Sequence, residues 1–403
     1  MRRAPPLCCG AAAAAVAAVE DCLRAIRLGR AEAALPRLNE LKATSRTVPG
    51  VDYARALCFL SGGGTGDVLA ARQSVLEELR LHPEHVDAQA LLHEINAAAR
   101  PLLSPPSEVC RAHPLFALLF DALLDHTMLM WPRLLHLFQA TERLARLDGA
   151  DGSGSDAGHI VECGTAGGGS AVLMAVVLAE AEAALGSCTT SSRRVLALDS
   201  FTGMPAPTVR DCLARVHPGS PPEQPHDEDE ATASWGAGTC RSPAAHVRQL
   251  ARAFAVEDRL VVIEGLFSDS IPEQLLPRQD VQRDGIALLH IDADWYDSTR
   301  VPLELLVPVM RQPAAGGGGG ACPHRVVQVD DYYYWQGCRD AVDEYLAKTE
   351  AAAVPPTLLC DVDDNAVWFA VSRGSVVRQE ADDQLHAPPH VPSHNTHAGP
   401  VGK

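Results

Sequence analysis

Three aspartates stand where apolar runs give way to polar residues. Asp292 ends the run "IALLHID" (286–292), and Asp330 and Asp331 end the run "RVVQVDD" (325–331). If both runs are neighbouring parallel strands, their carboxylates meet at one edge of a sheet. Carboxylates that close repel one another unless a cation lies between them, and an all-oxygen set suits Mg²⁺. In the alternative interpretation these acids only cap the segments that follow them.

A glycine-rich turn follows an earlier apolar run. "HIVEC" (159–163) leads into "GTAGGGS" (164–170), where a helix is expected to begin at Ser170. Glycines let the backbone approach a ligand closely, and a helix N-terminus favours an anionic group. The spacing differs from the dinucleotide pattern, and a purely structural turn is the alternative. Asp199 ends the next run, where doubly wound folds place an acid that binds a ribose diol, so both features together indicate an adenosine ligand without a pyrophosphate.

The elements that position these residues form a recognisable series. Apolar runs at 159–163, 194–199, 259–265, 286–292 and 325–331 alternate with helical stretches, which is typical of buried parallel strands. We therefore predict an α/β fold with a doubly wound, mostly parallel sheet. A β-hairpin turning at Asp364-Asn365 is expected to close it.

The helix after the fourth run has its own capping signal. "DST" (297–299) precedes "RVPLELLVPVM" (300–310), so Asp297, Ser298 and Thr299 are expected to cap a helix that has Pro302 in its first turn.

Residues 12 to 100 show a different, helical pattern that repeats itself. The segments 28–41 and 65–79 align by Gly29 with Gly66, an offset of 37 residues. Both place apolar residues at helical spacing behind a glycine turn, and the region resembles degenerate tetratricopeptide repeats. A groove for a protein partner and a helical cap packed on the main domain are both consistent with this pattern.

Composition bounds the function. The chain has 403 residues, 47% of them hydrophobic, and a formal charge of -17, which disfavours nucleic acid and acidic membrane surfaces as partners. The 12 cysteines show no Cys-x-x-Cys pair, which favours a reducing compartment. No apolar segment is long enough to cross a membrane, so we expect a cytoplasmic protein, although the Arg- and Ala-rich N-terminus leaves organelle targeting open.

Seven motifs follow one another along the second part of the chain: "HTML", "IVECGTAGGGSAVLM", "LALDSFTGMP", "VVIEGLFSDSIP", "LLHIDADWYDST", "VVQVDDYYYWQG" and "DVDDNAVWF". By these motifs and their order, residues 120–372 resemble the macrocin O-methyltransferase (TylF) family, which has the Rossmann-like class I fold of S-adenosylmethionine-dependent methyltransferases. The family's Asp-Gly-Asp-Leu-Tyr reads Asp292-Ala293-Asp294-Trp295-Tyr296 here. The expected domains are a helical segment at 1–110, a methyltransferase domain at 111–375 and a disordered tail at 376–403.

The resemblance also implies roles for individual residues. Asp292, Asp330 and Asp331 would bind Mg²⁺. The residues expected to bind S-adenosylmethionine are Thr127, Met128, Glu162, Gly164, Gly168, Ser170, Asp199, Ser200, Gly265 and Phe267. Among these, Glu162, Gly164 and Gly168 would line its methionine part, and Asp199 and Ser200 would hold its ribose.

Methyl transfer from a sulfonium needs an aligned hydroxyl that loses its proton. A divalent ion can chelate two neighbouring oxygens and lower the pKa of one, so the expected acceptor is a small molecule with a vicinal diol, such as a sugar or a catechol. Asp294 and His290 are the candidate general bases, and each could instead be structural. The rival hypothesis is a non-catalytic interaction protein with a degenerate methyltransferase domain. The oligomeric state, including a homo-oligomer, is left open.

Overall fold

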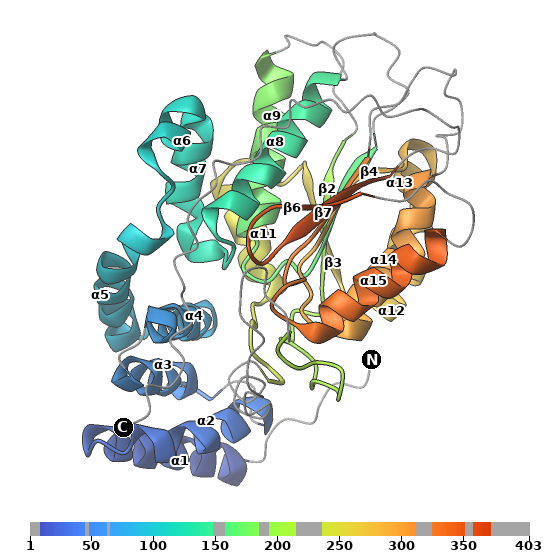
Figure 1. Ribbon diagram of the computed structural model, residues 1–403. Coiled ribbons are helices and arrows are strands. Elements are labelled where there is room, and N and C mark those ends of the chain that lie inside the picture. The colour runs from blue at the N-terminus through green and yellow to red at the C-terminus, as the bar shows by residue number, and fades with distance from the viewer. Residues whose placement is uncertain are drawn as a thin grey trace.

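The computed structural model describes residues 9–44, 48–62, 65–147, 158–184, 193–214, 236–311, 325–350 and 358–371. The tail expected at 376–403 lies outside these residues. Within them, one sheet and its covering helices are joined to a stack of N-terminal helices (Figure 1).

The sheet has seven strands in the order β3-β2-β1-β4-β5-β7-β6. Strands β1 to β5 pair in parallel, and β6 and β7 form an antiparallel hairpin beside β5. The bounds are β1 His159–Cys163, β2 Val195–Asp199, β3 Leu260–Glu264, β4 Ile286–Ile291, β5 Arg325–Val329, β6 Leu359–Asp361 and β7 Val367–Val371. The predicted doubly wound, mostly parallel sheet and its closing hairpin are confirmed.

Helices cover both faces of this sheet, which explains why its central strands are continuous apolar runs. Every residue of β1 and β4 is buried. Ile160 packs with one set of helices and its neighbour Val161 with the other, as alternation along a strand requires. One layer contains α8 (Trp131–Leu147), α9 (Gly169–Ala184) and α11 (Ala244–Ala253). The opposite layer contains α12 (Phe267–Ser270), η2 (Ile271–Leu275), α13 (Gln279–Asp284), α14 (Tyr296–Arg311) and α15 (Gln336–Glu350).

Helix α14 begins earlier than the sequence indicated. Its first residue is Tyr296, so Asp297, Ser298 and Thr299 lie inside the first turn and the prediction that they precede the helix was wrong. The N–H of Tyr296 instead donates to Oδ1 of Asp211 at 2.8 Å. A buried carboxylate from a distant segment therefore caps the helix, which no local pattern can show.

The N-terminal region is helical, as expected. It comprises α1 (Cys9–Arg27), α2 (Ala31–Thr44), α3 (Val51–Gly62), α4 (Thr65–Leu81) and α5 (Val86–Leu103), each packed against the next. Three shorter elements lead to the sheet: α6 (Ser107–Ala112), α7 (Pro114–Leu123) and η1 (Leu124–His126). The two segments aligned in the sequence correspond to α2 and α4.

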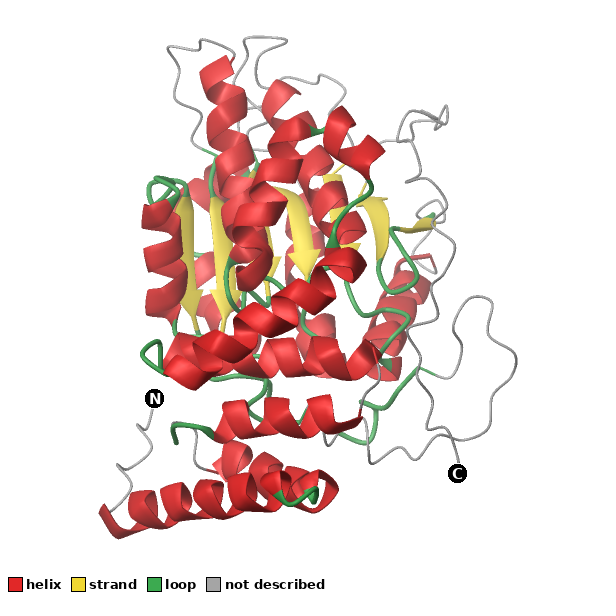
Figure 2. Cartoon of the chain, turned by 90° about the vertical axis from the view of Figure 1, so that its left-hand side faces the viewer, coloured by secondary structure: helices red, strands yellow, loops and turns green. Residues whose placement is uncertain are grey.

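These helices lie at the edge where the parallel strands end. In Figure 2 the arrowheads of the parallel strands in view point toward the N-terminal helices. Ala99 and Leu103 of α5 share one hydrophobic core with α7, α8 and α9, and the boundary expected at residue 110 falls inside α6. The helical region and the sheet are therefore joined by a common core. None of the described helices combines the length and apolar character needed to span a membrane.

Candidate active site

A polar row crosses the three central strands near their carboxyl ends. Glu162 of β1 is in register with His290 of β4, and His290 is in register with Gln328 of β5. All three side chains are fully buried. Buried polar groups require partners, and these three find them in one another and in Asp330 just beyond β5.

His290 lies at the centre of this row. Its Nδ1 is 3.0 Å from Oε1 of Glu162, and its Nε2 is 3.2 Å from Oδ2 of Asp330. Burial alone lowers the pKa of His290, but the hydrogen bonds to the two carboxylates outweigh it and raise that pKa to about 10. The ring is then an imidazolium that donates from both nitrogens. With no lone pair left, His290 is better suited to positioning carboxylates than to removing a proton.

Gln328 extends the row toward α8. Its Nε2 donates to Oδ1 of Asp330 at 3.0 Å, and its Oε1 lies 2.7 Å from Nδ1 of His136. Asp330 is thus held from both sides, by His290 and by Gln328. Burial alone raises the pKa of Asp330, but His290 outweighs it and holds that pKa below its usual value.

Asp292 lies beside Asp330 without comparable compensation. One ligand atom each from His290, Asp292 and Asp330 falls within 4.8 Å of the others. Burial raises the pKa of Asp292 well above its usual value, and the charges of Asp330 and Asp331 raise it further. This cluster of mutually repelling acids would accept a divalent cation, because carboxylate oxygens are the ligands that Mg²⁺ prefers.

Asp331 is not a member of that close group. Its Oδ1 accepts from Nδ2 of Asn365 at 3.0 Å, and its backbone is left-handed with φ of 64°. Burial raises the pKa of Asp331 to about 6, although the charge of Arg133 opposes the shift. Arg133 of α8 forms an ion pair with Asp363 at 3.1 Å and faces the same acids.

Asp294 has a fixed orientation two residues after Asp292. The indole N–H of Trp335 donates to its Oδ1 at 3.0 Å, and its backbone is also left-handed, with φ of 58°. Burial raises the pKa of Asp294 well above its usual value, and the charge of Asp331 adds to the shift. Non-glycine residues in this region of φ are strained and concentrate at functional sites.

The glycine turn between β1 and α9 is closely packed on several sides. A side chain at Gly164 would collide with the carbonyl oxygen of Asp292, and one at Gly168 would approach Val247 of α11 to 2.9 Å. Both glycines have positive φ, of 96° and 85°. Helix α9 begins at Gly169, one residue before the predicted Ser170, which is buried in its first turn.

The residues expected to bind the cofactor surround this turn. Both carboxylate oxygens of Asp199 accept backbone N–H groups, from Ala166 at 2.9 Å and from Phe201 at 2.7 Å. Each oxygen keeps a further lone pair for a ligand. Oε2 of Glu162 is buried and has no hydrogen-bond partner among the described residues. An orphaned carboxylate oxygen beside a glycine cradle fits the amino group and close approach of S-adenosylmethionine.

The remaining predicted residues occupy the same edge. The Cβ of Thr127 lies 2.8 Å from where a side chain at Gly169 would begin, and Met128 is partly exposed beside Cys240. The hydroxyl of Ser200 accepts the N–H of Thr202 at 3.2 Å. Beyond β3, Gly265 has φ of 147° and Phe267 is the first residue of α12.

Several contributors to the site were missed by the sequence analysis. They are Arg133, His136, Gln328, Asp363 and Asn365. Gln328 carried a visible signal, because it is the polar residue inside the buried run "RVVQV", and Asp363 and Asn365 lie in the quoted motif "DVDDNAVWF". The other two come from α8, whose approach to the acids depends on the fold.

Comparisons with known proteins give a family. The model of the macrocin O-methyltransferase (TylF) family matches residues 120–370. A search of curated proteins found no match. Among solved structures, the O-methyltransferase NovP is 26% identical with a TM-score of 0.42, covering 62% of this chain and 83% of that one. The calicheamicin methyltransferase CalS11 is 20% identical with a TM-score of 0.41, covering 69% and 92%. A Bacillus cereus O-methyltransferase in complex with SAH is 16% identical with a TM-score of 0.33, covering 69% and 97%.

Proposed function

The chain belongs to the macrocin O-methyltransferase (TylF) family, and on that premise we propose that it methylates one hydroxyl of a small-molecule vicinal diol with the help of Mg²⁺. As a family member it is an O-methyltransferase that uses S-adenosylmethionine. The diol and the metal are the proposed refinements. The family membership also favours an enzyme over the non-catalytic alternative.

The observation that carries the metal proposal is the uncompensated charge of Asp292 beside Asp330. Burial and the neighbouring acids raise the pKa of Asp292 well above its usual value, so the apo site disfavours the charged form of this carboxylate. Asp292 and Asp330 would hold the ion, and Asp331 would add a third negative charge. Bound there, a divalent ion would chelate two neighbouring acceptor oxygens and lower the pKa of the one to be methylated.

The protein's own groups prepare this arrangement. His290 donates to Glu162 and Asp330, which fixes both carboxylates at the carboxyl edge of the sheet. Glu162 would use its unpartnered oxygen for the amino group of the cofactor. His290 therefore acts as a positioning residue between the cofactor side and the metal side.

Asp294 is the proposed proton acceptor. Trp335 orients its carboxylate, and burial raises its pKa toward the range in which a carboxylate can act as a base. His290, the other candidate, has both nitrogens engaged. An acceptor with adjacent hydroxyls, such as a sugar or a catechol, matches a site that would hold two oxygens on one ion.

Two separate readouts test this proposal. Calorimetry measures binding of S-adenosylmethionine, and formation of S-adenosylhomocysteine measures transfer to catechol against phenol, and to a sugar diol against its monodeoxy analogue. We expect Mg²⁺-dependent transfer to the diols only. The Asp330→Asn/Asp331→Asn variant should bind the cofactor but lose transfer, whereas Asp364→Asn, at an exposed acid nearby, should retain it.

The outcomes are distinguishable. Equal transfer to phenol and catechol, or transfer in a chelator, would overturn the diol and metal refinements. Absence of cofactor binding by the unmodified protein would overturn the proposal as a whole.

A further inference from the structure

We propose that Arg80, in helix α4 of the N-terminal region, binds the carboxylate of the methionine part of S-adenosylmethionine. The N-terminal helices would then form one wall of the cofactor site. Arg80 lies outside residues 120–370, which the family model matches. The inference rests on the proposed function and adds a binding residue to it.

Arg80 reaches the glycine turn between β1 and α9. A side chain at Gly167 would place its Cβ 2.5 Å from Nη2 of Arg80, 2.9 Å from Cζ of Arg80 and 2.5 Å from the carbonyl oxygen of His126. The guanidinium therefore occupies the space that a side chain at this position would need. A residue of the helical region and the cofactor turn are in direct contact.

The donors of Arg80 are largely unused. Its Nε and Nη1 are buried and have no hydrogen-bond partner among the described residues, and its Nη2 makes one long contact, 3.4 Å, to the carbonyl oxygen of Asp125. Leaving buried donors of a charged group unpaired is costly. The unpartnered donors of Arg80 therefore favour the binding of an anionic ligand.

Arg72, two turns earlier on α4, has the hydrogen-bond and ion-pair partners that Arg80 lacks within the part of the chain that the structure describes. It forms an ion pair with the carboxylate of Asp125, donates to the carbonyl oxygen of Leu124 at 2.8 Å and donates from Nε to Asn96 at 2.7 Å. Arg72 joins the helices to the catalytic domain, whereas Arg80 reaches the same interface without a carboxylate partner. The difference separates a structural arginine from a binding one.

The charges of Glu77 and Asp125 reach Arg80, but neither carboxylate forms an ion pair with it, so the site favours a further anion. The glycine turn opens α9, a helix of 16 residues whose N-terminus carries partial positive charge. His126 and His246 lie beside the guanidinium, with Nδ1 of His126 3.1 Å from Nε2 of His246. Burial, together with the charge of Arg80, lowers the pKa of each imidazole. Neutral imidazoles supply no negative charge to the guanidinium. The carboxylate at the methionine end of the cofactor has the required charge, and its two oxygens match a guanidinium fork.

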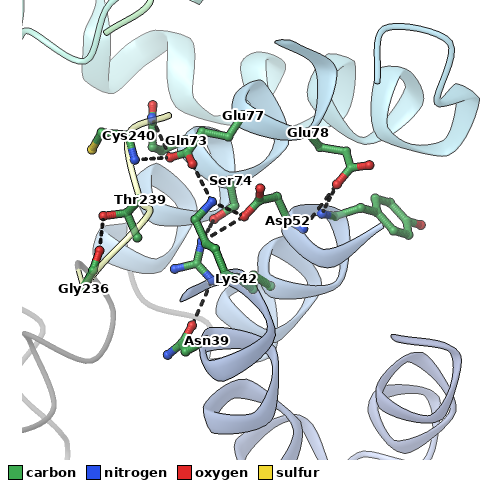
Figure 3. Close-up of polar contacts among 12 residues, drawn as sticks. Asn39, Lys42, Asp52, Gln73, Ser74, Glu77, Glu78, Gly236, Thr239 and Cys240 are labelled. Carbon is green, nitrogen blue, oxygen red and sulfur yellow. Dashed lines mark hydrogen bonds and ion pairs between the residues drawn. The ribbon is translucent and has the colours of Figure 1, made fainter. Parts of the chain in front are cut away.

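Helix α4 is held firmly enough to position this group. Glu77, one turn before Arg80, accepts the backbone N–H of Cys240 at 2.9 Å and forms an ion pair with Lys42 (Figure 3). Lys42 also pairs with Asp52, and Arg55 with the same carboxylate. We call Lys42, Asp52, Arg55 and Glu77 the helical charge network. It fixes α4 against the segment that follows residue 236.

The test compares two ligands that differ in the methionine part. S-adenosylhomocysteine carries the carboxylate, and methylthioadenosine lacks the whole amino-acid portion. Both are titrated calorimetrically into the full chain, as the unmodified protein, Arg80→Ala, Arg80→Lys and Arg100→Ala. Arg100 is a matched control, because it lies on α5 with a solvent-exposed side chain paired to Asp121.

We expect Arg80→Ala to weaken the binding of S-adenosylhomocysteine by about 10- to 100-fold, which corresponds to the free energy of hydrogen bonds to a charged group. The affinity for methylthioadenosine should stay within about twofold of that of the unmodified protein. Arg80→Lys should lose less, and Arg100→Ala should change neither ligand. Equal weakening of both ligands, or no change, would overturn the role of Arg80. If Arg80→Ala does not fold, the test rests on Arg80→Lys. The role of Arg80 would then be overturned if Arg80→Lys binds S-adenosylhomocysteine as tightly as the unmodified protein does and prefers it to methylthioadenosine by the same factor. Failure of the unmodified protein to bind S-adenosylhomocysteine would count against the cofactor assignment itself.

Discussion

The helical charge network is buried and the acids at the edge of the sheet are buried or half-buried, but their charges are arranged in opposite ways. Burial alone raises the pKa of Asp52, yet Lys42 and Arg55 outweigh it and lower that pKa below its usual value. Burial also raises the pKa of Asp292, and there the neighbouring Asp330 and Asp331 raise it further. One region is balanced within the protein, and the other is not.

This contrast separates a structural role from a binding role. In the helical network two cations face two carboxylates within hydrogen-bonding distance, which fixes α2, α3 and α4 against one another. At the sheet edge, Asp292, Asp294 and Asp331 all have raised pKa values, so the charged forms of these carboxylates are disfavoured in the apo protein, whose own residues compensate them poorly. An imbalance of this kind supports the proposed binding of an external cation at these acids.

The largest expected effect tests the balanced region. Lys42→Met leaves Asp52 and Glu77 buried with their main cation removed, so we expect the free energy of unfolding to fall by about 3 to 5 kcal/mol. Urea unfolding followed by circular dichroism measures it. Lys348→Met, at an exposed pair with Glu304, should cost under about 1 kcal/mol. Similar small losses in both variants would contradict the structural role of the network.

We call Asp292, Asp294, Asp330 and Asp331 at the end of the parallel strands the acid edge. A substitution there should change stability in the opposite direction. Asp292→Asn removes one uncompensated charge, so transfer should fall by about 100-fold or more through lost metal binding, while the folded protein gains about 1 kcal/mol of stability. Initial rates of S-adenosylhomocysteine formation and thermal unfolding without added metal measure the two effects. Loss of both activity and stability would show that Asp292 is a structural acid like Asp52.

Added metal should stabilise the acid edge alone. At ten times its dissociation constant, Mg²⁺ should raise the free energy of unfolding by about 1.4 kcal/mol in the unmodified protein and by much less in Asp292→Asn. Thermal unfolding at constant ionic strength provides the measurement, with Na⁺ as the control cation. Equal stabilisation of both proteins would place the bound ion elsewhere.

The smallest effect concerns pH at the junction of the two regions. Burial, with help from Arg80 and His126, lowers the pKa of His246 to about 4. The contribution of the neutral His246 to the free energy of unfolding is complete above about pH 6.5, its pKa in the unfolded chain. It is lost as the pH falls toward 4, because the unfolded chain takes up the proton first. Between about pH 7 and about pH 5, the free energy of unfolding should therefore fall by about 1 kcal/mol less in His246→Gln than in the unmodified protein. Urea unfolding at both pH values measures this, with the exposed His93→Gln as control. An unchanged pH dependence in His246→Gln would refute the assignment.

Much of the fold was readable from the chain. Strands β1 to β5 were predicted to within two residues of their observed ends, because strands buried on both faces appear as short, uninterrupted apolar runs. The hairpin was readable from the turn residues at Asp364-Asn365. The start of α14 was not, since its cap is Asp211 from a distant segment.

The candidate site was readable in part. Asp292 and Asp330 could be placed at one edge of the sheet because a residue at a strand end has a known position relative to the sheet. The contacts of His290 with Glu162 and Asp330 could not be predicted, because they form only through the register of β4 with its neighbours. Arg80 was hidden altogether, since it lies in a helical region whose sequence pattern carries no information about the sheet.

The sequence by itself determined the features that depend on neighbouring residues: the apolar periodicity, the glycine turn and the placing of acids at strand ends. The tertiary structure decided which charges face one another, and hence that Asp52 is neutralised by cations while Asp292 is not. It also decided that Arg80 meets the glycine turn between β1 and α9. The physical reason is that desolvation and Coulomb interactions depend on distances in space, and those distances join residues that are far apart along the chain.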